Sequence, residues 1–217
     1  MPGGLTAINP AAIAVVLLLT GCGGNEPTDE ERVDAALLQL ADFPADAGWA
    51  VQPETTDPEQ ARFDAAIEEC EAENDPTLDS RTANRDSETF TRGQDVLAVS
   101  NAAVVADEQV RDDLFEALDA MLGCFATALE TELLAQAPDE FTVRVADPQP
   151  LAISTAADRS EGRAVQLSIQ AETIFIDLVA IEQGPTLLYG AFMHQGDLTQ
   201  DDEAQILAPA VQRLQEL

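Results

Sequence analysis

The sequence predicts a single α+β domain in which an antiparallel sheet is backed by helices on one face. Stretches with helical periodicity and stretches with strand-like alternation follow one another as helix, strand, helix, two strands, long helix, about four strands and helix. Short connections join the last strands, which favours an antiparallel arrangement. Hydrophobic residues make up 46% of the chain, enough to argue against global disorder.

The first part of the chain alternates between helix and strand signals. Residues 32–40 place apolar side chains at helical spacing, and a short strand is expected at residues 49–52. Trp49 is expected to pin the preceding loop onto the core, and stacking on a ligand is its alternative role. Asp57-Pro58 is a suitable helix start, with Asp as the cap and Pro in the first helical position. Cys70 falls on the buried face of that helix.

The middle of the chain predicts a loop at residues 74–86 and then two strands, at residues 88–93 and 95–106. Alternate residues of the second strand share one face: Val96, Ala98, Ser100, Ala102 and Val104. Residues 107–136 form the longest helical stretch. Its continuous apolar stripe consists of Leu114, Leu118, Leu122, Phe125, Leu129 and Leu133.

The last third is mostly strand. The expected strands span residues 141–146, 163–170, 173–183 and 186–194. Gly184-Pro185 is suited to a tight turn between the last two. Thr199 and Asp202 form a capping-box pattern that opens a final helix, and Pro209 should kink or split that helix.

The N-terminus carries a different signal. Ala11 to Leu19 is apolar, but it is shorter than the roughly 20 residues that a membrane-spanning helix needs. It is followed by Leu19-Thr20-Gly21-Cys22, which resembles a bacterial lipobox. The resemblance implies a signal peptide at residues 1–21, a lipid on Cys22, a flexible tether over residues 22–31 and an extracytoplasmic domain over residues 32–217. The partner of the anchored chain would be the cell membrane, reached through that lipid.

The charge of the chain excludes whole classes of partner. The formal net charge is −31, and every basic residue is arginine. Such a surface repels nucleic acid and anionic lipid headgroups, so neither is an expected ligand.

Cys70 and Cys124 are the two cysteines that remain once Cys22 carries a lipid. In an oxidising compartment a disulfide between them is favoured over two free thiols. A metal pair is disfavoured because His194 is the only histidine and no Cys-x-x-Cys spacing occurs.

The sequence offers no recognisable catalytic motif. It lacks Gly-x-Ser-x-Gly, a Gly-rich phosphate loop and His-Glu-x-x-His. His194 sits at a predicted strand end and is expected to be an exposed loop residue rather than a base. The acidic run Asp201-Asp202-Glu203, like the acids from Asp107 to Asp113, is expected to stabilise the dipole of the helix it opens. We therefore predict no catalytic residue, no metal ligand and no cofactor.

Four features follow one another in this chain: the lipobox, Leu40-Ala-Asp-Phe-Pro, Gly48-Trp49, and a cysteine on each of two successive helices. Together they resemble small actinobacterial lipoproteins of the sensor-domain type, akin to the extracellular domains of mycobacterial Ser/Thr kinases. This resemblance implies binding outside the cell without catalysis, with a small apolar molecule or an envelope protein as the ligand. The alternatives are a cell-envelope hydrolase that uses paired carboxylates and a structural envelope protein. The sequence does not identify the ligand-binding residues.

The lipid anchor can be tested directly. Cys22→Ser removes the only sulfur that a lipobox would present for acylation, so the variant should lose metabolic labelling with palmitate and accumulate as an uncleaved precursor. Gel mobility and intact mass give the result. Cleavage and labelling identical to those of the unchanged protein would contradict the anchor.

Overall fold

A computed structural model describes residues 26–53, 58–93, 95–136, 142–170 and 172–217. The predictions for the signal peptide, for Cys22 and for the first residues of the tether lie outside these residues. Within the described part of the chain, no helix combines the length and the apolar character that crossing a membrane requires.

The described helices and strands follow the predicted order closely. The helices are α1 (Asp29–Ala36), α2 (Pro58–Asn74), α3 (Glu108–Gln136) and α4 (Gln200–Gln215), with 3-10 turns η1 (Leu40–Asp42) and η2 (Leu78–Ser80). The strands are β1 (Trp49–Val51), β2 (Arg81–Asp86), β3 (Phe90–Arg92), β4 (Val96–Val105), β5 (Val143–Val145), β6 (Gln149–Leu151), β7 (Arg159–Ile169), β8 (Glu172–Gln183) and β9 (Thr186–His194). The predicted α+β class, with one antiparallel sheet in a single domain, is confirmed.

All of these strands belong to one sheet with the order β1-β3-β4-β9-β8-β7-β5. β2 also pairs with β4, and β6 also pairs with β7. Each described pairing is antiparallel, and β7, β8 and β9 form a continuous meander. The long strands β4, β9, β8 and β7 therefore make the centre of the sheet.

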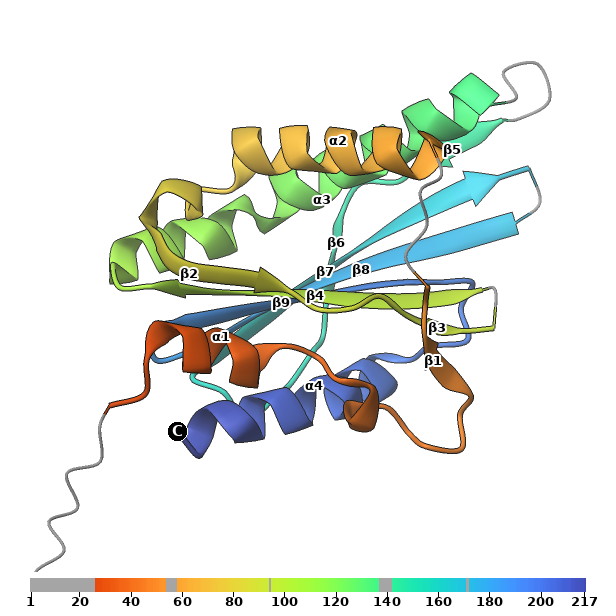
Figure 1. Ribbon diagram of the computed structural model, residues 1–217. Coiled ribbons are helices and arrows are strands. Elements are labelled where there is room, and N and C mark those ends of the chain that lie inside the picture. Colours follow the sequence, from red (N-terminus) through yellow and green to blue (C-terminus); the bar gives the residue numbers. More distant parts are fainter. Residues whose placement is uncertain (1–25, 54–57, 94, 137–141, 171) are drawn as a thin grey trace, which may run out of the picture.

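Helices cover the sheet on both faces, and in this respect the prediction of helices on one face is wrong. α2 and α3 lie on one side, whereas α1 and α4 lie on the other (Figure 1). The central strands explain the arrangement, because they are apolar on both faces. In β8, Val179 and Ile181 join the core beneath α1 and α4, while Leu178 and Ala180 join the core beneath α3. Each face therefore needs its own helical cover.

Local sequence signals place several elements correctly. β9 spans the predicted residues 186–194, and the predicted face of β4 is buried throughout. The Thr199 hydroxyl caps α4, and the Asp202 carboxylate accepts from the Thr199 backbone N–H at 2.9 Å, as the capping-box pattern predicts. Trp49 packs on Phe43 with 4.4 Å between ring centroids, so it does hold its loop against the core.

Residues 81–86 contradict one local prediction, and α4 contradicts part of another. Residues 81–86, expected in a loop, form the strand β2. Only Ala83 of this strand is buried, so its sequence has no apolar alternation to reveal it. α4 continues through Pro209 as one helix instead of splitting there.

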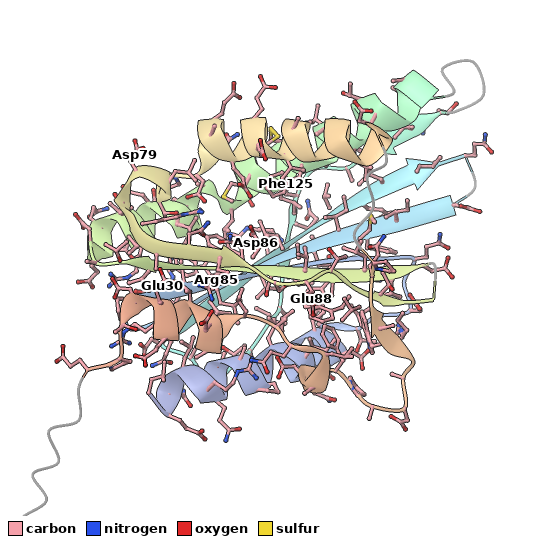
Figure 2. The ribbon with its side chains drawn as sticks, in the orientation of Figure 1. Glu30, Asp79, Arg85, Asp86, Glu88 and Phe125 are labelled. Atoms are coloured by element: carbon pink, nitrogen blue, oxygen red, sulfur yellow. A yellow bond between two sulfur atoms is a disulfide. The ribbon has the colours of Figure 1, made fainter. Side chains whose placement is uncertain are left out.

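The N-terminal segment is held by charged side chains from later elements. Arg213 of α4 donates to the carbonyl oxygens of Ala35 and Leu37, at 2.9 and 2.7 Å, and pairs with Asp42 of η1. On the outer side of α1, Arg85 of β2 pairs with Glu30 at 2.9 Å (Figure 2). Helix α1 is thus fixed to the body of the domain.

A disulfide joins Cys70 of α2 to Cys124 of α3, as predicted. α2 packs chiefly on α3, outside the sheet layer. The two cysteines are 54 residues apart, and closing a loop of that length stabilises a fold by about 4 kcal/mol in the chain-entropy model. The bond therefore holds the outermost helix to the rest of the domain.

The double variant Cys70→Ala with Cys124→Ala should lower the melting temperature and raise amide exchange in α2 more than in β8 and β9. The physical reason is that α2 then depends on its packing against α3 alone. Mass-resolved hydrogen exchange measures the difference. As a control, Cys70→Ala alone should expose one alkylatable thiol, whereas the unchanged domain should show none without reductant. Uniform exchange across the domain would contradict this role.

Candidate functional site

Three polar side chains from three elements meet inside the domain. Asp177 comes from β8, His194 from the end of β9 and Glu203 from the first turn of α4. Their carboxylate and imidazole ligand atoms lie within 4.8 Å of one another. All three residues are buried, with exposed fractions of 4%, 5% and 0% in that order. Buried polar groups at such density are costly unless they satisfy one another.

Strand register brings Asp177 and His194 together. Phe175 and His194 are cross-strand partners, and Asp177 follows Phe175 by two residues on the same face of β8. The Phe175 and His194 rings stack with 5.3 Å between centroids. The Thr199–Asp202 cap fixes the first turn of α4 above this point, which puts Glu203 against the pair.

The histidine ring has a defined tautomer. The backbone N–H of Gly196 donates to Nδ1 at 3.0 Å, so Nδ1 carries no proton. The ring proton is therefore on Nε2, which donates to Oδ2 of Asp177 at 2.9 Å. Both ring nitrogens are thus engaged within the protein.

Glu203 is protonated in this environment. Burial raises the pKa of its carboxyl group to about 9, and the hydrogen bond with Asp177 and the charges of Asp177 and Asp202 act in the same direction. Two neighbouring carboxyl groups can form a hydrogen bond only when one of them carries a proton. The proton on Glu203 supplies that donor.

An open pocket of about 580 Å³ lies against this cluster. Asp177 and His194 line the pocket, whereas Glu203 is not among its lining residues. The apolar part of the lining consists of Leu151, Ala164, Phe175 and Leu198. The polar rim is the start of α4, with Thr199, Gln200 and Asp201. The pocket is therefore lined by both apolar and polar side chains, and one of them is the buried carboxylate of Asp177.

Two sequence-based expectations about these residues are wrong. His194 is buried rather than exposed, because α4 covers the end of β9. Glu203 lies in the first turn of α4 as expected, but a protonated carboxyl group contributes no charge to the helix dipole. Asp202 does hold its charge there, because hydrogen bonds from the Thr199 hydroxyl and backbone lower the pKa of its carboxyl group.

Sequence reasoning identified none of the three residues as a site. One signal was available: Asp177 interrupts the apolar run Ile174 to Ile181, and a charge inside a buried strand requires a partner. The identity of that partner depends on register and on helix placement, which sequence periodicity does not reveal. Cys70 and Cys124 lie on α2 and α3, across the sheet from this cluster.

The sequence matches no protein-family model and no curated protein. The fold is similar to the crystal structure of the extracellular domain of PknH from Mycobacterium tuberculosis, with a TM-score of 0.50 and 11% sequence identity, covering 89% of this chain and 100% of that domain. The Ran-binding protein Mog1p of Saccharomyces cerevisiae matches with a TM-score of 0.24 and 13% identity, over 59% of this chain and 74% of Mog1p. The PknH match shows a shared fold, in line with the expected likeness to a mycobacterial kinase extracellular domain. The Mog1p match is too weak to show a shared fold.

Glu203→Gln should remove a pH-dependent loss of stability. The carboxyl group has a pKa of 4.5 when unperturbed and about 9 in the fold, so the folded state holds one more proton than the unfolded chain between these values. The free energy of unfolding therefore falls as pH rises from about 5 to 9. A glutamine amide does not titrate and can donate to Asp177 in place of the acid.

Thermal melts between pH 5 and pH 9 measure this effect. The Gln variant should lose less stability than the unchanged protein over this range and should melt higher at pH 8. The other titratable groups facing Glu203 are Asp177, His194 and Asp202. Glu216→Gln, at the exposed end of α4, is the matched control and should leave the pH profile unchanged. Parallel profiles for the Glu203 variant and the unchanged protein would contradict a proton held on Glu203.

Proposed function

We propose that this chain is a lipid-anchored, noncatalytic binding domain on the outer side of the cytoplasmic membrane. The observation that carries the proposal is the pocket of about 580 Å³ whose base is the buried Asp177–His194 pair. A half-apolar concavity with a few convergent polar groups is the usual form of a small-molecule site.

Three features support the extracytoplasmic part of the proposal. The Ala11–Leu19 run and Leu19-Thr-Gly-Cys22 fit an exported, lipidated precursor. The Cys70–Cys124 disulfide fits an oxidising compartment. The similar fold of the PknH extracellular domain supports the same location by analogy.

The bonded state of His194 supports a noncatalytic role. A general base needs a free nitrogen within reach of a substrate proton, and both nitrogens of this ring are already bonded. The carboxylate-hydrolase alternative gains no support from Asp177 and Glu203. In glycoside hydrolases the two carboxyl groups flank the scissile bond at about 5 Å or more. Here the carboxyl oxygens lie within 4.8 Å of each other and both groups are buried, which leaves no room for a glycosidic bond between them.

A bulky side chain at the pocket tests the binding function. Ala164 lines the pocket and is the cross-strand partner of Asp177, so Ala164→Trp should fill it. Native mass spectrometry of the full protein, purified from its own membranes, should show a bound small molecule that this variant loses.

The matched control is Thr91→Trp, which fills a smaller pocket of about 350 Å³ beside β3 and β4. That variant should keep the bound molecule. If both variants retain the bound molecule equally, the ligand binds outside the pocket that Ala164 lines. Protein from native membranes that carries no ligand in any variant would contradict the proposal.

A further inference from the structure

The acid pair beneath the pocket has more acceptors than the protein supplies donors for. Among the described residues, Oδ1 of Asp177 and both carboxyl oxygens of Glu203 have no N–H or O–H donor when the two groups are ionised. The proton on Glu203 provides one hydrogen bond between the two carboxyl groups. Of the two groups only Asp177 lines the pocket, so this carboxylate is the acceptor that a ligand can reach.

The tautomer of His194 decides against a metal ion as that ligand. The three side chains would fit a divalent metal by proximity alone. A metal-bound histidine presents an unprotonated nitrogen to the ion and donates its other ring N–H to an acceptor. Here the pattern is reversed: Nδ1 accepts from Gly196, and Nε2 points its proton at Asp177. Metal ligation would break both hydrogen bonds.

The pocket lining favours a positively charged ligand with an apolar body. Asp177 at the base and Asp201 at the rim supply negative charge, and no arginine lines the pocket in the described part of the chain. The net charge of −31 adds a long-range preference for cations over anions. Leu151, Phe175 and Leu198 offer apolar surface within the same pocket.

We propose that the pocket binds a primary amine with an apolar body, its ammonium group seated against Asp177 and its body along Leu151, Phe175 and Leu198. This proposal rests on the binding function proposed above. A primary ammonium group carries three N–H donors and no acceptor, and Oδ1 of Asp177, the carboxylate that lines the pocket, receives no N–H donor from the described part of the protein. It also leaves both hydrogen bonds of His194 intact, since it accepts nothing from the ring. A quaternary ammonium has the charge but lacks the donors.

Isothermal titration of the full protein in nonionic detergent can separate these requirements. The probes are n-pentylamine, 1-pentanol, pentanoate and pentyltrimethylammonium, which share one chain and differ in charge and in N–H donors. Pentylamine should bind saturably and at least tenfold more tightly than each of the other three. Detergent without protein provides the blank.

Two variants locate the bound amine. Asp177→Asn should weaken pentylamine binding at least tenfold. Asp79→Asn removes the same charge from the η2 turn near α2, away from the pocket, and should change binding less than twofold (Figure 2). Asp201→Asn at the rim should produce an intermediate loss. Because Asp177→Asn removes a buried charge and can affect folding, the probe comparison on the unchanged protein decides independently.

The outcomes distinguish this proposal from the binding function itself. Pentanol or pentanoate binding as tightly as pentylamine, and lost in Ala164→Trp, would overturn the amine class and keep the pocket as a binding site. Equal binding of the quaternary probe would overturn the donor requirement. Zinc chloride binding that disappears in Asp177→Asn would replace the amine with a metal. Failure of every probe, together with protein that carries no native ligand, would overturn both proposals.

Discussion

The sheet is covered on both faces, and this double burial governs every polar side chain in its central strands. The side chains of β8 from Asp177 to Ile181 are buried, as are most of those of β9, so they point into one helical layer or the other and not into water. Asp177 is therefore placed where a carboxylate must find donors within the protein. His194 provides one through Nε2, and a proton on Glu203 provides the other. The cluster is a consequence of the layer architecture as much as of its three residues.

The same constraint explains which parts of the structure the sequence predicts. β9 and the buried face of β4 follow from apolar spacing, and the start of α4 follows from Thr199 and Asp202, because these signals act over a few residues. β2 gives no such signal, since it is a polar strand recruited by pairing with β4. The second helical layer was also missed. The apolar residues on both faces of β8 could have indicated it, but only the tertiary arrangement shows which helix covers which face.

The candidate site could not be predicted because its geometry is nonlocal. His194 follows Asp177 by 17 positions and meets it only through the register of one hairpin. Glu203 resembles any acid in the first helical turn until burial raises its pKa. Its neighbour Asp202 has the opposite fate, with a lowered pKa, because it caps the exposed helix end instead of pointing at the sheet. Adjacent acids in one sequence run thus have different protonation states for purely positional reasons.

The chain contains no lysine, and this matters if the pocket binds amines and many copies of the protein lie close together. The proposed lipid anchor would confine many copies of this protein to a two-dimensional layer, where surface groups of one copy meet its neighbours at high local concentration. Every basic side chain here is a guanidinium, which is planar and broader than an ammonium group. No side chain of a neighbouring copy can therefore imitate a primary amine in the pocket. Under the proposed anchoring and amine binding, the side chains of neighbouring copies would not compete with the free ligand for the pocket.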